Sequence, residues 1–413
     1  MTAGKARSLM RMSRPLAPVL CMAIALSAHA QQPAASGNDQ GKSNQELLKR
    51  IDELEAQVRQ LAQNQAAPPP SPAVEEPRPN SVNDRLKLNV FGDVGFEASD
   101  LKPSTNSFRI GSLDLFMTAH LSDRVSTLAE VLFVSTSDNS IAPDVERLLL
   151  QYRHNDYFTV GIGRYHTSIG YYNTAFHQGA WFQTAVDRPF MYAFDDEGGF
   201  LPLQEVGITT IGVIPSGKLG LTYVAEVGNG RNHLLGGDPA QNAHDTNNGK
   251  SVNFSLSAHP SGLSGLDLGF SIYHDYLTFS DNINHSELIS TVHFVYLNST
   301  YEFLNEAMLV RHVGSSTGAP GVFHTPAFYT QISRKFHSSY RPYFRYQYIN
   351  AGVNEPIYGD PTDGPVVGRR NGASVGLRYD FTEHSAFKLQ YDRAQRRGVP
   401  SSNGLDTQFA FTF

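Results

Sequence analysis

Ionisable side chains recur throughout this chain, and their spacing limits the chemistry that they can do. The chain has 15 histidines, but none lies in a G-x-S-x-G or H-E-x-x-H motif. His166 and His177 are the nearest candidates for a metal ligand or a general acid or base, and their place in a long polar loop favours an ordinary polar role. We therefore expect no catalytic residue, no bound metal and no cofactor, and we expect the protein not to be an enzyme.

Charged residues at alternate positions could instead line a water-filled path, where they would attract or repel ions. If the apolar face of each segment points outward, acids lie on the inner face of the first segments and bases on the inner face of later ones. Separate acidic and basic sectors would create a field across the water column. Alternatively, these charges pair within the wall, since Asp380 and Asp392 lie beside the basic residues. The predicted lining residues are Asp93, Asp114, Glu130, Arg147, Arg153, Arg345, Arg378 and Lys388.

The longest predicted connection, 166–203, is rich in aromatic residues and holds the only tryptophan of the chain. Loops of this length are usually functional. So many rings would be costly on an outer surface, which favours a loop packed inside the structure and narrowing it. A cap over the structure, or a contact with a neighbouring subunit, is the alternative. The candidate residues are His166, Tyr171, Tyr172, His177, Trp181 and Arg188.

The elements that must position these residues are β-strands. In the first segment Leu86, Leu88 and Val90 share a face, and in the last segment the shared face ends at Phe413. About sixteen such segments follow one another from residue 85 onward. They predict an all-β fold, a transmembrane antiparallel β-barrel of about sixteen strands over 85–413, because an even number closes with both ends on one side.

The predicted connections alternate in length, which is typical of outer-membrane barrels. Short turns such as 122–124, 155–156, 215–217 and 382–384 follow even-numbered strands. Longer loops follow odd-numbered strands. They are predicted at 98–107, 135–143, 166–203, 229–249, 278–285, 312–322, 350–370 and 394–403.

The N-terminus is typical of a secretory signal over residues 1–30. Lys5, Arg7, Arg11 and Arg14 precede a short apolar stretch, and an A-x-A site follows at 28–30. Cleavage would remove Cys21, the only cysteine, and with it any disulfide or thiol chemistry.

Two further segments are predicted before the barrel. Residues 31–65 contain a heptad over 44–62, with Ile51 and Val58 at a and Leu54 at d, and would form a coiled-coil oligomerisation segment. Residues 66–84 are rich in proline and would form a semi-rigid linker. Asn, Ile and Val at the a positions, with Leu at the d positions, favour a two-stranded coiled coil. The sequence nevertheless leaves open whether the protein is a dimer or a trimer.

Composition excludes some partners. The formal net charge of the whole chain is −6, and the signal contributes only bases, so a nucleic-acid partner is not expected. No segment after the signal approaches the roughly 18 apolar residues of a membrane helix. Tyr and Phe are nevertheless abundant, at 19 and 25, which suits a barrel with a lipid-facing aromatic belt.

Three segments of the sequence resemble Gram-negative general porins, in particular the phosphate-selective porin O/P group and related porins with an N-terminal periplasmic coiled coil. They are Leu86–Asp93, Gly161–His166 and Phe409–Phe413, and the resemblance covers about 85–413 as an architecture. It implies a trimeric sixteen-stranded barrel in the outer membrane, with the coiled coil in the periplasm. It also implies a third external loop that folds inward and narrows the pore.

The expected function is then passive diffusion of small hydrophilic solutes, including anionic ones, through a water-filled channel. The chain departs from the phosphate-selective pattern, because only Arg188, with Arg164 at its entrance, adds positive charge to the 166–203 loop. The alternative function is a structural barrel tethered to periplasmic partners through the coiled coil. The partners expected are copies of the chain, outer-membrane lipid and small solutes.

Overall fold

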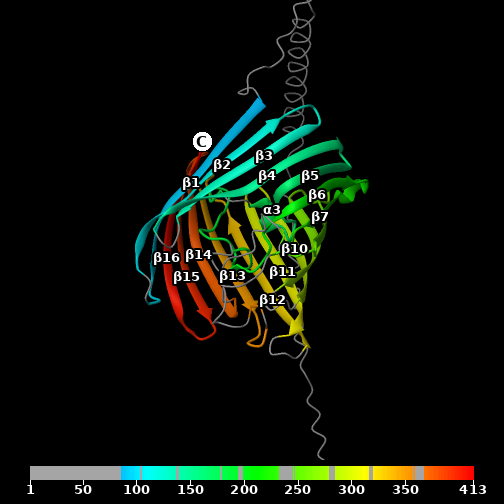
Figure 1. Ribbon diagram of the computed structural model, residues 1–413. Coiled ribbons are helices and arrows are strands. Elements are labelled where there is room, and N and C mark those ends of the chain that lie inside the picture. The colour runs from blue at the N-terminus through cyan, green and yellow to red at the C-terminus, as the bar shows by residue number, and fades with distance from the viewer. Residues whose placement is uncertain are drawn as a thin grey trace, which may run out of the picture. The chain divides into compact units, whose positions relative to one another are not determined.

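The protein forms a closed barrel of sixteen antiparallel strands in the computed structural model (Figure 1). The structure describes residues 85–102, 105–135, 139–176, 179–193, 199–231, 245, 247–278, 284–315, 320–355, 357–358 and 367–413. The predicted fold class and strand number are confirmed. The predicted signal, coiled coil and linker lie outside the described residues.

Each strand pairs with its neighbours in sequence, and β1 pairs with β16 to close the barrel. Closure leaves no strand edge, so every strand can satisfy its backbone polar groups within the barrel. The strands are β1 Leu86–Ser99, β2 Ser107–His120, β3 Val125–Ser135, β4 Ile141–Asn155, β5 Phe158–His166, β6 Gln204–Ile214, β7 Leu221–Gly228, β8 Ser251–Ala258, β9 Leu266–Thr278, β10 Asn284–Leu297, β11 Tyr301–Ser315, β12 Pro320–Arg334, β13 Tyr340–Asn350, β14 Arg369–Thr382, β15 Ser385–Arg396 and β16 Val399–Thr412.

The alternation of side chains sets the two faces of the barrel wall, as the sequence predicted. In β16 Leu405 and Phe409 are exposed on the outer face, as is Phe413 directly after the strand, whereas Gln408 and Ala410 are buried on the inner face. The terminal residue takes part in closure, because Phe413 and Val90 exchange backbone hydrogen bonds of 2.9 and 3.0 Å. The aromatic end of the chain is therefore part of the seam.

Short and long connections lie at opposite ends of the barrel, but several loops are shorter than predicted. The predicted loop 394–403 is wrong: β15 runs to Arg396 and β16 begins at Val399, and these two residues are paired. Gly398, with a φ of 75°, allows the tight turn between them. Strand pairing continues past the predicted ends because each added pair satisfies further backbone groups.

The connection between β5 and β6, residues 167–203, is the longest in the barrel and is called loop 3 here. It contains the 3₁₀ turn η1 (Phe190–Tyr192) and the short helix α3 (Tyr172–Ala175), which lies within the barrel in Figure 1. Its apolar residues pack on the inner face of β9 to β13, in one buried cluster with residues of those strands. Many side chains on this part of the inner wall are apolar and are covered by loop 3, so the lumen is not lined by polar residues throughout.

One further helical turn is present among the described residues outside loop 3. The 3₁₀ turn η2 (Gly217–Leu219) lies in the connection between β6 and β7. Among the described residues, no helix is both long and apolar enough to span a membrane.

Candidate functional site

Backbone N–H groups in the first half of loop 3 bind acidic side chains of the inner wall. Glu306 of β11 accepts hydrogen bonds from the N–H groups of Tyr171 (2.6 Å) and Tyr172 (2.9 Å). Glu226 of β7 accepts from the N–H of Ser168, at 3.1 and 3.2 Å for its two oxygens. These carboxylates are almost completely buried. A buried carboxylate is stable only when it is hydrogen-bonded, so the loop and the wall satisfy each other.

Backbone carbonyls in the second half of loop 3 bind basic side chains of β13, β14 and β15. Arg345 of β13 donates to the carbonyl of Asp187 (2.5 Å). Arg378 of β14 donates to two carbonyls, those of residues 181 (2.6 Å) and 183 (2.9 Å). Lys388 of β15 likewise donates to the carbonyls of residues 180 and 185, at 2.6 and 3.1 Å. Three predicted lining residues therefore anchor loop 3.

This anchoring takes the basic side chains out of contact with water. Arg345 is 1% exposed and Lys388 is 0% exposed, and Arg378 also pairs with Asp380 at 2.7 Å. A field set up by these cations would act on solutes only through the loop that covers them. Acidic and basic sectors are also not opposite, since β14 and β2 are separated only by β15, β16 and β1.

A single cation of loop 3 holds the loop in shape. Arg188 donates to the carbonyls of Tyr192 (2.6 Å) and Phe176 (3.1 Å), and its guanidinium lies 5.3 Å from the ring of Tyr172. Burial raises the pKa of Tyr172 to about 12, which Arg188 partly offsets. Burial likewise raises the pKa of Tyr171 to about 12. Both phenols therefore stay protonated across the neutral range.

The predicted acidic residues of β1 to β3 have partners within the wall. Asp93 accepts hydrogen bonds from the N–H of Ser112 (2.9 Å) and from Gln408 (2.9 Å). Glu130 pairs with Arg147 of β4 at 2.5 Å. Asp114 lies on β2 and is completely buried. Several of these acidic side chains therefore have partners within the barrel wall, which is the alternative that the sequence had left open.

The remaining predicted residues lie in different places. Arg153 lies at the turn end of β4, where it is exposed and pairs with Asp156. His166 is the last residue of β5, with Nε2 3.8 Å from an oxygen of Glu146, and so precedes loop 3. Trp181 lies under the guanidinium of Arg378, at 4.8 Å. His177 lies outside the described residues.

In the alternation of side chains along β5, Arg164 falls in line with the residues that point outward. The sequence left open whether a bulge intervenes or the residue lies above the membrane. The pairing of β5 with β4 and β6 shows no shift at this residue, and Arg164 donates to Gln204 at 2.8 Å. A bulge is therefore excluded, and Arg164 remains on the outer face near the loop end of the strand.

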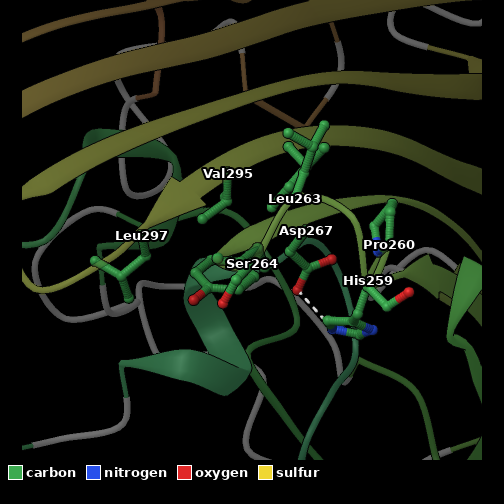
Figure 2. Close-up of a pocket in the computed structure, with 11 residues that line it drawn as sticks. His259, Pro260, Leu263, Ser264, Asp267, Val295 and Leu297 are labelled. Carbon is green, nitrogen blue, oxygen red and sulfur yellow. Dashed lines mark hydrogen bonds and ion pairs between the residues drawn. The ribbon is translucent and has the colours of Figure 1, made fainter. Parts of the chain in front are cut away.

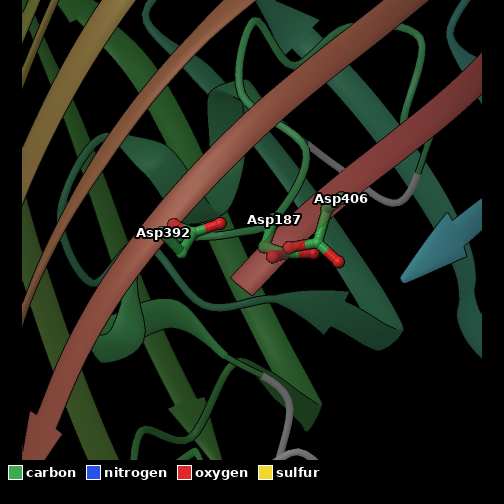
Figure 3. Close-up of side chains that lie close together, drawn as sticks. All are labelled: Asp187, Asp392 and Asp406. Carbon is green, nitrogen blue, oxygen red and sulfur yellow. The ribbon is translucent and has the colours of Figure 1, made fainter. Parts of the chain in front are cut away.

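One group of charged side chains that meets water lies where loop 3 faces β1, β2, β15 and β16. Carboxylate oxygens of Asp187, Asp392 and Asp406 lie within 4.8 Å of one another (Figure 3). Arg109 of β2 approaches Asp187 at 3.8 Å and Glu97 of β1 at 4.0 Å. The side chains of Asp187 and Glu97 are 54% and 49% exposed, so this mainly acidic group of side chains meets solvent beside the loop.

Sequence reasoning missed most of the acids that hold the loops. Glu306 and Glu226 were not among the predicted lining residues. A second buried group ties other loops to the wall: Arg231, after β7, binds Glu287 of β10, and His312 of β11 lies 2.8 Å from the same carboxylate. The alternation of side chains along each strand could have placed these acids on the inner face. Their partners could not have been found in this way, because they lie far away along the chain.

Comparisons with known proteins agree with this architecture. The sequence matches no described protein family and no curated protein. The fold is similar to that of the anion-selective porin from Comamonas acidovorans (10% identity, 79% of this chain and 99% of that chain, TM-score 0.56). It is also similar to the outer membrane channel DcaP of Acinetobacter baumannii (10% identity, 80% of this chain and 98% of that chain, TM-score 0.53).

A third similar structure is the trimer form of OmpT, an outer membrane protein of Vibrio cholerae (11% identity, 80% of this chain and 100% of that chain, TM-score 0.52). At these identities the likeness concerns the fold. The chain therefore has the fold of the sixteen-stranded barrels of Gram-negative outer membranes.

Proposed function

We propose that this protein is an outer-membrane porin, a water-filled channel for the passive diffusion of small hydrophilic solutes, narrowed by loop 3. One observation carries the proposal: loop 3 is bound inside the barrel along both of its halves. Carboxylates of the wall bind its first half, and cations of the wall bind its second half. A barrel that served only as an anchor would gain nothing from a narrowed interior. The similar structures, two of which are described as a porin and a channel, support the same function.

The solute path that we infer runs past Asp187 and Arg109, beside loop 3. Its exposed charges are mostly acidic, and the predicted basic lining residues Arg345 and Lys388 are buried under the loop. This arrangement favours a channel that admits small polar solutes of both signs over one that selects strongly for anions. A column of exposed Arg and Lys side chains, which phosphate selection needs, is not formed by the described residues.

We further propose that the protein is a homo-oligomer in the outer membrane of a Gram-negative bacterium. The trimer form of the similar Vibrio cholerae protein favours a trimer over a dimer. In this proposal residues 1–30 are removed on export, and the coiled coil of 31–65 stands in the periplasm on the linker of 66–84. The tethering function remains the alternative and depends on that segment.

Conductance across planar lipid bilayers tests the porin function directly. The purified full chain should insert in discrete steps, and a variant without residues 170–200 should conduct more current per step because the constriction is gone. Absence of steps for the full chain, with heat-dependent gel migration showing a folded barrel, would favour the tether. Equal step sizes for both proteins would remove loop 3 from the mechanism.

A further inference from the structure

Three arginine side chains lie on the outer face of the barrel wall at the loop end of β14 and β15, which are neighbouring strands (Figure 1). Arg369 begins β14 and alternates in line with the exposed, outward Val375. Arg393 on β15 and Arg397 directly after it are in line with the outward Tyr391. All three arginines are exposed. We call Arg369, Arg393 and Arg397 the arginine rim.

The strand register concentrates positive charge at this corner of the barrel. The backbone N–H of Arg397 donates to the carbonyl of Arg369 (2.8 Å), so these two residues lie opposite each other. Arg370 and Arg396 form the next pair of the ladder. Arg393 lies four residues before Arg397, a separation of about 14 Å along a strand. Because like charges opposite each other destabilise a sheet, a bound anion would stabilise this corner.

The barrel itself supplies little counter-charge to the arginine rim. Among the described residues, no acidic side chain forms an ion pair with any of its three guanidinium groups. Asp100 attracts Arg393 but does not form an ion pair with it. Its carboxylate instead accepts from the backbone N–H (2.6 Å) and the side-chain amide (2.5 Å) of Asn403. The rim therefore keeps its guanidinium donors for a partner outside the described residues.

Polar groups at the opposite, turn end of the barrel differ from the rim, because they are paired locally. Nε2 of His259 lies 3.1 Å from one oxygen of Asp267, and Nε2 of His293 lies 3.0 Å from the other. Figure 2 shows His259 directed at Asp267 beside a cavity of about 570 Å³. Arg153 likewise pairs with Asp156. Exposure at an end of the barrel thus does not by itself leave a cation without a counter-charge.

The outward side chains place the arginine rim at the level of lipid headgroups. Further along the same face, Val375 of β14 and Leu389 of β15 are exposed and apolar, and the aromatic Tyr391 borders them. Such a band faces the acyl chains in an outer-membrane barrel, with aromatic side chains at its edges. The polar Asn371 and Gln395 separate the rim residues beyond this band. Since the long loops of such barrels point out of the cell, these headgroups belong to the outer leaflet.

We propose that the arginine rim binds the phosphate groups of a phosphorylated glycolipid of the outer leaflet, of the lipid A type, while the apolar band below it contacts the acyl chains. This rests on the outer-membrane location proposed above. Guanidinium groups form bidentate, charge-assisted hydrogen bonds with phosphate oxygens. The separation of Arg393 from Arg397 suits a headgroup that carries two phosphates. The bound lipid would also offset the repulsion between Arg369 and Arg397.

Binding of fluorescently labelled lipid A to the purified full chain, refolded in nonionic detergent without lipopolysaccharide, tests the proposal by fluorescence anisotropy. Lipid A with both phosphates should bind more tightly than dephosphorylated lipid A with the same acyl chains, and added NaCl should reduce the difference. Arg369→Gln, Arg393→Gln and Arg397→Gln should each weaken binding of the phosphorylated lipid about fivefold, and the triple variant on the order of a hundredfold. Binding of the dephosphorylated lipid should not change.

Matched controls separate the arginine rim from general attraction to a cationic protein and from misfolding. Arg124→Gln removes an exposed arginine from the turn between β2 and β3 and should bind phosphorylated lipid A like wild type. Heat-dependent gel migration checks that each variant forms the barrel. Equal affinity of the wild type for both lipids would show that only the acyl chains bind and would overturn the proposal. Wild-type affinity in the folded triple variant, or an equal loss in Arg124→Gln, would do the same.

Failure of this proposal and failure of the porin function give different results. A chain that binds lipid A through its phosphates but shows no conductance steps would overturn the porin function and leave the arginine rim as a lipid site. A chain that conducts but binds both lipids equally would keep the porin function and overturn the lipid site.

Discussion

Replacement of Glu306 by glutamine should release loop 3 from the barrel wall. One oxygen of this carboxylate accepts from the N–H of Tyr171 (2.6 Å) and the hydroxyl of Tyr192 (2.7 Å). The other accepts from the N–H of Tyr172 (2.9 Å) and the hydroxyl of Tyr329 (2.7 Å). Four donors therefore converge on one buried side chain, and three of them belong to the loop.

Glutamine has the same shape but replaces one acceptor oxygen by a donor NH₂ group. Whichever way the amide is oriented, two of the four donors then face another donor. A buried donor without a partner costs about 1–3 kcal/mol, so the loop-bound state should lose about 2–6 kcal/mol. Rotation of a tyrosine hydroxyl reduces this cost, and even about 2 kcal/mol shifts the ratio of bound to released loop by about thirtyfold.

Single-channel recording of Glu306→Gln should therefore show larger open-channel noise and a higher mean conductance than wild type. The barrel itself should persist, since the wall hydrogen bonds between strands are unaffected, and heat-dependent gel migration checks this. Glu383→Gln, in the exposed turn between β14 and β15, is the matched control and should conduct like wild type. Wild-type noise and conductance in folded Glu306→Gln would refute the view that this carboxylate anchors the loop.

Three further predictions follow from the same contacts. Gly170→Ala should also raise conductance, because Gly170 has a φ of 74° and a Cβ there would lie 2.4 Å from Glu306; wild-type current would contradict this. Replacing both Arg345 and Arg378 by alanine should raise conductance and shift the reversal potential toward cation selectivity, whereas an unchanged potential would show that these cations do not act on permeating ions. The pKa of Tyr172, raised to about 12, means that the unfolded chain, with a tyrosine pKa of about 10, loses its proton first. Stability should therefore be full below pH 10 and fall between about pH 10 and 12, as thermal unfolding monitored by circular dichroism can measure; a flat profile there would contradict the burial of this phenol.

The sequence by itself determined the barrel. The alternation of inward and outward side chains is a local property that can be recognised within one segment, such as 405–413. An even number of sixteen such segments can close into a barrel, which leaves no strand edge unpaired. Strand ends at the loop side were misplaced, as at 394–403, because pairing beyond the apolar band leaves no hydrophobic pattern to read. The length and aromatic content of 166–203 also indicated a loop inside the barrel.

Only the tertiary structure decided what the charges do. Tyr171 and Glu306 are 135 positions apart, and Asp187 and Arg345 are 158 apart, so no local pattern could pair them. The parity of Arg345 correctly placed it inward, but whether it meets water or a backbone carbonyl depends on the path of loop 3. Folding the loop inward converts inward-facing charges into its anchors, because a buried charge is stable only with a partner.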